Sequence, residues 1–203
     1  GADGEASPWT DEQTIEVRSA SSGTQQMIAT AIKVPAAKFK GHSNMASGDL
    51  ITSLVASAAA DNANKAIGIL ATDGADKNRD KLKILAYQHY EQNCTYLPDS
   101  TSTSFDKQNV RDGHYPIWGP LHMLARSEGG EVSNPNAKQV IDYLSGKAES
   151  EDFDLIQTEA KGGVVPDCAM HVKRDKEGGP LSSYQPEKSC ECKFLTAATG
   201  SAP

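Results

Sequence analysis

The spacing of apolar residues restricts this chain to a fold in which strands and helices alternate. Thr14–Arg18 alternates apolar and polar residues, as a half-buried strand does, whereas Ser22–Lys33 repeats its apolar residues at helical spacing. Further strands are predicted over Ala66–Ala71 and Leu82–Tyr87, and further helices over Gly48–Ala58, Asn134–Gly146 and Asp152–Ala160. This order predicts an α/β fold with a mainly parallel or mixed sheet flanked by helices. In the Asn134–Gly146 helix the apolar residues expected to face inward are Ala137, Val140, Ile141 and Leu144.

Charge and length narrow the possible partners. The 203 residues include 27 Asp and Glu against 20 Lys and Arg, which gives a formal net charge of −7. An acidic chain without a basic stripe is a poor partner for nucleic acid, so we expect none. No apolar run approaches the roughly 20 residues that a transmembrane helix needs. Gly1–Trp9 is polar and acidic, unlike a signal peptide, so we expect either a mature exported protein or a cytosolic one.

The chain divides by composition into three parts. Residues 1–12 are rich in small and acidic residues and are predicted to be a leader or linker. Residues 13–163 carry the strand and helix patterns and are predicted to form one α/β lobe. Residues 164–203 lack a clear period, and we expect an irregular, disulfide-bearing tail.

Four cysteines favour an oxidising compartment over the cytosol. They are Cys94, Cys168, Cys190 and Cys192. A tail without its own core is typically held by disulfides, which form in exported proteins. Cys190 and Cys192 are too close in sequence to bridge each other comfortably, so we expect Cys168 to pair with one and Cys94 with the other. A copper(I) site using these thiols with Met170 and His171 is the alternative, although the spacing matches no established ligand set.

The segment from Arg18 to Gln25 is the candidate binding site. A strand delivers Arg18, small residues make a turn, and a helix begins at Ser22. The first N–H groups of a helix have no intrahelical partners and carry partial positive charge, so this junction suits an anion. Arg18 can offer two parallel hydrogen bonds to a carboxylate or another oxyanion. The predicted ligand-binding residues are Arg18, Ser19, Ser21, Ser22, Gly23, Thr24 and Gln25.

The same segment has a simpler interpretation. Ser22 and Gln25 are three residues apart, the spacing of a capping box, in which each side chain caps a backbone N–H at the helix start. In that interpretation Arg18 forms an ordinary surface ion pair and no ligand is bound.

Four segments together resemble the second lobe of the phosphate-binding proteins of ABC transporters and of the wider type II periplasmic binding proteins. Arg18–Thr24 is similar to their Arg-Ser-x-x-Ser-Gly-Thr segment, and Gly41–Ala71 to their stretch from a Gly-Asn turn through a helix to an Ala-Ile-Gly-Tyr strand. Tyr115–Ile117, followed by Leu121–Ala125, looks like the strand that crosses back to the first lobe, and Asn134–Gly146 like the return helix. The resemblance covers about residues 13–163.

The resemblance implies an exported, non-enzymatic solute-binding protein without a cofactor, located in the periplasm or outside the cell. It would bind a small anionic or polar solute and deliver it to an ABC permease or a sensor. Two departures qualify this. Ala20 stands where the phosphate-specific branch has an Asp that accepts a proton from phosphate, and the chain begins at the crossing into lobe two. We therefore expect either a first lobe elsewhere, approached by residues 114–148, or self-association.

Two other functions fit parts of the sequence. Asn109–Trp118 concentrates Arg111, Asp112 and His114 as an active site would, but no nucleophile stands in a recognisable frame. A structural or adhesive module that reuses the fold without a ligand is the other alternative. Ala20 and the missing lobe favour that alternative.

Overall fold

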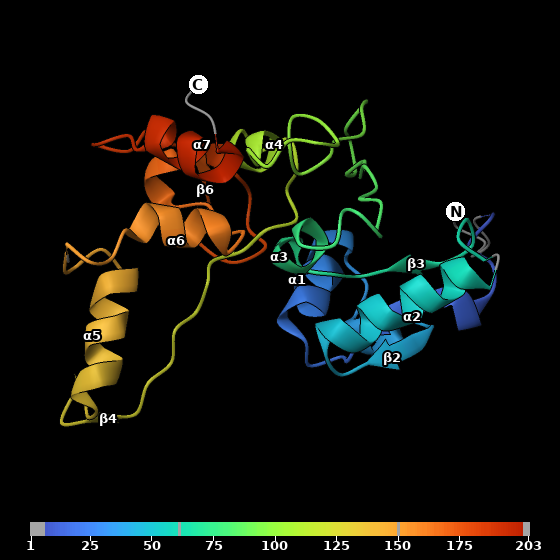
Figure 1. The fold of residues 1–203 in the computed structure, drawn as a ribbon, viewed down its shortest axis with the longest axis horizontal. Coiled ribbons are helices and arrows are strands. Elements are labelled where there is room, and N and C mark those ends of the chain that lie inside the picture. Colours follow the sequence, from blue (N-terminus) through green and yellow to red (C-terminus); the bar gives the residue numbers. More distant parts are fainter. Residues whose placement is uncertain (1–6, 61, 150, 201–203) are drawn as a thin grey trace.

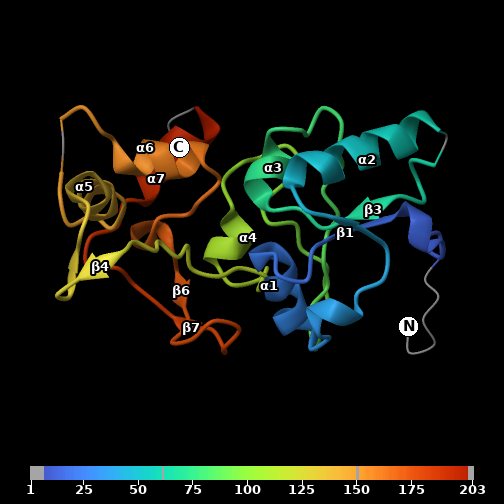
Figure 2. The same cartoon turned by 90° about the horizontal axis from the view of Figure 1, so that it is seen from below.

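The computed structural model describes residues 7–60, 62–149 and 151–200. The first six residues of the expected 1–12 leader lie outside this range; Glu12 begins the short helix η1 (Glu12–Thr14). The first half of the chain forms a sheet with its helices, and the last third forms a second group of helices beside it, as Figures 1 and 2 show. None of the described helices is long and apolar enough to cross a membrane.

The first half of the chain is built on a small parallel sheet, as the sequence predicts. Its strands β1 (Ile15–Arg18), β2 (His42–Asn44) and β3 (Ile67–Gly68) lie in the order β2-β1-β3. Helix α1 (Gly23–Ile32) follows β1, η2 (Ala36–Lys38) comes next, and α2 (Ser47–Ala59) follows β2. This confirms the predicted α/β class with a parallel sheet and flanking helices.

Helix α2 packs directly on the sheet. Leu50 on α2 is fully buried, and a Cβ atom at Gly68 of β3 would lie 2.9 Å from Leu54 Cδ1. Only a residue without a side chain therefore lets the helix approach β3 so closely. This packing sets α2, and with it the loop that joins β2 to α2, beside the end of β1.

The middle of the chain is held by buried ion pairs instead of the strand predicted over Leu82–Tyr87. Helix α3 (Thr72–Asp76) precedes a long irregular segment whose pairing is a single bridge between Tyr87 and Tyr96. Asp76 and Asp99 each bind both Arg79 and Lys107, with N–O distances of 2.6 to 2.9 Å. Burial alone would lower the pKa of Arg79, but the two carboxylates raise it, which keeps the guanidinium charged.

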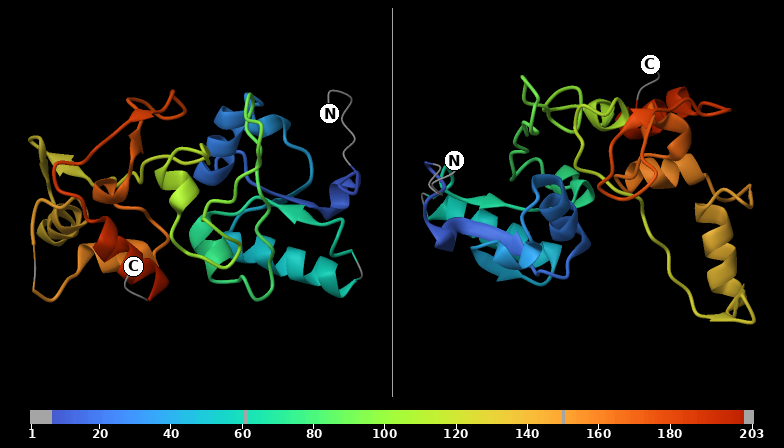
Figure 3. Two further views of the ribbon diagram at one scale, coloured as in Figure 1. Left: turned by 90° about the horizontal axis from the view of Figure 1, so that it is seen from above. Right: turned by 180° about the vertical axis from the view of Figure 1, so that it is seen from behind.

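A long arm leaves the body after Tyr115 and carries α5 away from it. The arm continues through the hairpin β4 (Ser127–Glu128) and β5 (Glu131–Val132) to α5 (Pro135–Leu144). Figure 3 shows the arm apart from the sheet from two directions. The helix itself confirms the predicted Asn134–Gly146 segment. The expected inward face forms only in part, because Ala137, Ile141 and Leu144 are half-buried whereas Val140 is 55% exposed.

The C-terminal tail is folded, which corrects the prediction of an irregular tail. After α4 (Gln108–Arg111) and α6 (Leu155–Lys161), the chain forms η3 (Asp167–Ala169), the hairpin β6 (Val172–Lys173) and β7 (Ser182–Ser183), and α7 (Glu191–Thr199). Helix α7 packs on α6, across the expected boundary after residue 163. Phe194 of α7 is 1% exposed and lies beneath the Arg111 guanidinium, so one buried ring anchors the tail to the chain before it.

One place where the two halves of the chain meet is the end of α6. Gly163 has a φ of +72° there, and a Cβ atom at this residue would lie 3.0 Å from Asp73 Cα. Asp73 belongs to α3, so backbone from the second half touches backbone from the first.

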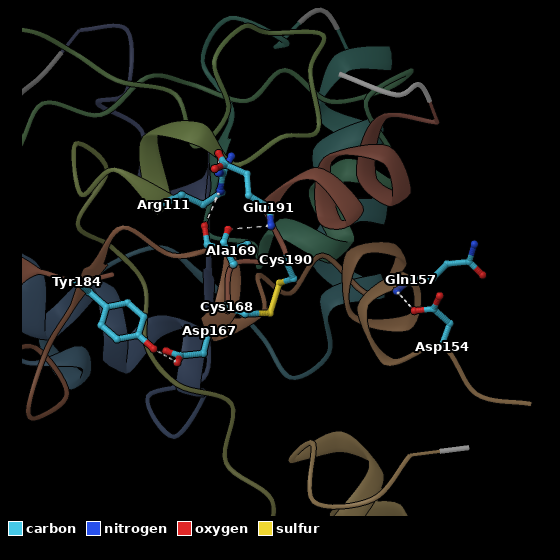
Figure 4. Close-up of a disulfide and its surroundings, with 10 residues drawn as sticks. Arg111, Asp154, Gln157, Asp167, Cys168, Ala169, Tyr184, Cys190 and Glu191 are labelled. Carbon is cyan, nitrogen blue, oxygen red and sulfur yellow. Dashed lines mark hydrogen bonds and ion pairs between the residues drawn. A yellow bond between two sulfur atoms is a disulfide. The ribbon is translucent and has the colours of Figure 1, made fainter. Parts of the chain in front are cut away.

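One of the two expected disulfides is present. Cys168 and Cys190 are joined, with their Cα atoms 5.3 Å apart, and the bridge ties η3 to the start of α7 (Figure 4). Cys94 and Cys192 are free and exposed, so the second expected pair is wrong. Cys190 lies just before α7 and is bonded to η3, whereas Cys192 lies within the first turn of α7 and is exposed.

Loss of this disulfide should destabilise the protein measurably. The bridge closes a separation of 22 residues, so the variant Cys168→Ser should lose about 3 kcal/mol of unfolding free energy. Urea unfolding followed by circular dichroism measures it. Cys192→Ser removes an exposed free thiol and serves as the control; equal stability of the two variants would contradict the prediction.

Candidate functional site

The candidate site lies at the edge of the sheet where β1 and β2 end. Arg18, the last residue of β1, is paired in register with Asn44, the last residue of β2. Because the two strands are parallel, helices α1 and α2 both begin just beyond this edge, and Figure 2 shows both helices next to the sheet. In open α/β sheets, ligands gather at this edge.

The Arg18 guanidinium lies across the loop that leads into α2. Its Nη1 donates to Ser47 Oγ at 2.7 Å, and its Nη2 donates to the Met45 carbonyl at 3.0 Å. Its Nε is buried and has no acceptor within the described part of the chain. Among those residues no carboxylate pairs with Arg18, so the ordinary ion pair of the simpler interpretation is not formed. The charge of Arg18 is held in place by neutral groups alone.

The start of α1 is open. Ser22 occupies the position before the helix, but its side chain accepts no hydrogen bond from the helix N–H groups. Within residues 7–60, 62–149 and 151–200, no acceptor meets the N–H groups of Gly23, Thr24 and Gln25. A Cβ atom added at Gly23 would meet nothing within 4 Å, so no protein atom covers this residue. Asn134 caps α5 and Asp154 caps α6, whereas the starts of α2, α3, α4 and α7, like that of α1, have no side-chain cap among the described residues.

The capping-box interpretation is wrong for Gln25. Its side chain turns inward, accepts from the Arg18 N–H at 2.8 Å and donates to the Ala36 carbonyl at 3.1 Å. Gln25 is only 2% exposed. It therefore connects the end of β1, the first turn of α1 and η2. Its side chain does not face outward, and it holds the Arg18 backbone close to α1.

The turn between Arg18 and α1 is formed by small residues. The Ser22 N–H donates to the Ser19 carbonyl at 2.9 Å, and the hydroxyls of Ser19 and Ser21 lie 3.2 Å apart. Ser21 and Gly23 are exposed, while Ser19, Ser22 and Thr24 are half-buried. The corner thus combines hydroxyl groups, free backbone donors and the partial positive charge of a helix start. Ala20, in the middle of the turn, adds no acceptor.

The structure gives little support to an active site at Asn109–Trp118. His114 stacks on Tyr96 with ring centroids 4.9 Å apart, and His122 is exposed on the arm. Burial, together with the nearby Tyr87, raises the pKa of Tyr115 to about 12, so this phenol stays protonated near neutral pH.

The sequence missed a charged cluster at the base of α7. Asp112 and His171 approach to 2.6 Å, and Arg111 binds both the Ala169 carbonyl and Glu191. Burial acts to raise the pKa of Glu191, but the hydrogen bond and charge of Arg111 lower it. These partners are 58 to 80 residues apart, so no local spacing could reveal them. The far nitrogen of His171 lies 3.5 Å from a Glu191 oxygen, so the cluster links α4, the segment after η3 and α7.

The structure gives the copper alternative no ligand set. Cys168 and Cys190 are joined to each other, which removes two of its thiolates. In the part of the chain that the structure describes, no three His, Cys, Asp or Glu side chains come together as metal ligands would.

Comparison with known proteins identifies no relative of this chain. No family model, no curated protein and no solved structure matches this chain.

Proposed function

We propose that this chain is an extracytoplasmic solute-binding module that holds a small anionic or polar solute at the start of α1. Arg18, Ser19, Ser21, Ser22, Gly23 and Thr24 contact the solute, and Gln25 braces the corner from behind. The module resembles the second lobe of a type II periplasmic binding protein, and an ABC permease or a surface sensor receives the loaded protein. The module binds its solute and does not transform it.

The observation that carries this proposal is the open start of α1 beside Arg18. Three backbone N–H groups have no acceptor in the described chain, although Ser22 stands where a serine ordinarily caps a helix. Arg18 adds a positive charge that no described carboxylate neutralises. Free donors and an unpaired guanidinium at one corner favour a guest with negatively charged oxygens.

The chemistry of the corner favours an anion that carries no proton. The Arg18 guanidinium and the backbone N–H groups can only donate hydrogen bonds, the Ser and Thr hydroxyls can donate or accept, and Ala20 offers no carboxylate to accept from an acidic O–H. A sulfate or a carboxylate presents only acceptors, so it fits these donors better than a hydrogen phosphate does. The disulfide between Cys168 and Cys190 is consistent with an oxidising, extracytoplasmic location.

A matched pair of arginine variants tests the proposal. Thermal shift and calorimetry against sulfate, phosphate, carboxylates and amino acids identify a solute, because a solute that binds only the folded state raises its stability. Arg18→Ala should then weaken binding at least tenfold, since it removes a charge-assisted hydrogen-bonding group. Arg126→Ala is the control: it removes the same charge from an exposed ion pair with Glu128.

Gly23→Ala is a second variant that separates binding from folding. Alanine has a higher helix propensity than glycine, and its methyl group meets no protein atom at this position, so the fold should be kept or slightly stabilised. The methyl group would still stand where a solute approaches the backbone, and affinity should fall. Normal affinity in both variants would refute the site. Failure of every solute in the panel would instead favour the ligand-free structural module.

A further inference from the structure

The protein exposes more surface than a closed monomer of its size. Its accessible surface is 13078 Å², whereas a compact monomer of this mass exposes about 9,200 Å². Few apolar side chains are buried, and several large ones are exposed. Obligate dimers bury roughly 2,000–5,000 Å² in total, or about 1,000–2,500 Å² from each copy, so a difference on the order of 4,000 Å² per chain leaves enough surface for such an interface.

Much of this exposed apolar surface lies on the arm. Leu121 is 69% exposed, Leu124 is 96% exposed, and Val140 on α5 is 55% exposed. The apolar residues of α5 share one face of the helix, and nothing in α5 is buried. Figures 1 and 3 show that the body of the same chain does not cover this helix. The arm therefore carries an amphipathic helix whose apolar face is only partly covered: Ala137, Ile141 and Leu144 are half-buried, and Val140 is exposed.

A shallow apolar groove on the sheet is the second uncovered surface. It lies over β1 and β3, between Phe39 and Lys40 on one side and Ile67 and Ile69 on the other, and its floor includes Ile15. Its volume is about 260 Å³, room for one or two aliphatic side chains. Helix α2 packs against β3 at Gly68, but the groove has no α2 residue in its lining.

We propose that two copies of this chain exchange arms, each placing the apolar face of α5 in the groove of its partner. Val140 and its neighbours on α5 fill the groove beside Phe39, and the extended segment with Leu121 and Leu124 follows the surface toward it. This association is independent of the solute assignment, because the groove and the arm contain none of the proposed solute contacts.

Three observations favour a second copy as the occupant. The apolar helix face and the apolar groove occur on the same chain but apart from each other, so two copies satisfy both at once. A two-fold arrangement makes the contact twice, as closed symmetric dimers do. The surface that each copy exposes beyond a compact monomer is also larger than the area that a stable dimer buries on each copy.

Sedimentation velocity of the full chain tests this proposal. The protein should be dimeric at about 10 µM, and higher salt should strengthen the dimer because each copy carries a net charge of −7. Val140→Glu should raise the dissociation constant at least tenfold, since it places a charge in an apolar contact. Val55→Glu, on the exposed side of α2, is the matched control and should leave the dimer intact.

A mixing experiment distinguishes arm exchange from other modes of association. Phe39→Lys changes the groove, and its near-ultraviolet circular dichroism reports whether the fold is kept. Each variant alone should be monomeric, whereas a mixture of Val140→Glu and Phe39→Lys should form heterodimers that retain one intact contact. A wild-type monomer up to about 100 µM, a dimer insensitive to Val140→Glu, or a mixture that stays monomeric would each overturn the proposal.

Discussion

Replacing Asp99 by alanine should lower the free energy of unfolding by about 3–5 kcal/mol. Asp99 is 2% exposed and accepts from Arg79 at 2.6 Å and from Lys107 Nζ at 2.9 Å. Its carboxylate also accepts from the Lys107 backbone N–H at 2.8 Å. Without Asp99, two cations are left with the single carboxylate of Asp76 in a buried place. Chemical unfolding of the purified variant measures the loss.

Two further variants show whether the loss of stability comes from the buried ion pairs. Asp99→Asn keeps the shape but not the charge, so a loss similar to that of alanine assigns the effect to the ion pairs. Asp142→Ala removes a carboxylate whose partner, Lys138, is on the surface, and it should have little effect. The explanation fails if Asp99→Ala unfolds at the same denaturant concentration as Asp142→Ala.

Phe194→Ala should destabilise the protein by about 3–5 kcal/mol. The ring is 1% exposed, and the Arg111 guanidinium lies 5.7 Å from its centroid. Its removal leaves a cavity between α7 and the rest of the second half. Heat or urea unfolding, followed by near-ultraviolet circular dichroism, measures the effect.

Val140→Ala is the matched control for the phenylalanine variant. It also removes apolar atoms, but from an exposed position on α5, so its effect in the monomer should be small. If Phe194→Ala unfolded no more easily than Val140→Ala, the tail would contribute nothing to the stability of the folded protein.

The sequence predicted the first half well because its strands and helices carry clear periods. Thr14–Arg18, Ser22–Lys33 and Gly48–Ala58 correspond to β1, α1 and α2 within one or two residues. The strand predicted over Leu82–Tyr87 failed for a different reason. An alternating pattern becomes a strand only where a neighbouring strand pairs with it, and this segment pairs at one bridge only.

The tail could not be predicted from local patterns because its stability comes from distant contacts. Helix α7 depends on a disulfide from η3, a buried phenylalanine and a bond between Glu191 and Arg111, which are 80 residues apart. None of these leaves a period in the sequence.

The candidate site was predictable in its outline but not in its details. The strand, the small turn and the helix appear at the expected residues. The capping box did not form, because the Arg18 N–H and the Ala36 carbonyl together draw Gln25 inward. The spacing of two residues alone does not determine with which of several nearby backbone groups their side chains form hydrogen bonds.

The contact between Gly163 and Asp73 is one of the contacts that set how the two halves of the chain are arranged. With the backbones this close, even one methyl group at position 163 would act as a wedge and tilt the helices of the second half away from α3. The arm starts from that second half, so a small tilt at this joint would become a large displacement at the tip of α5. The absence of a side chain at Gly163 thus contributes to the orientation in which the arm meets any partner.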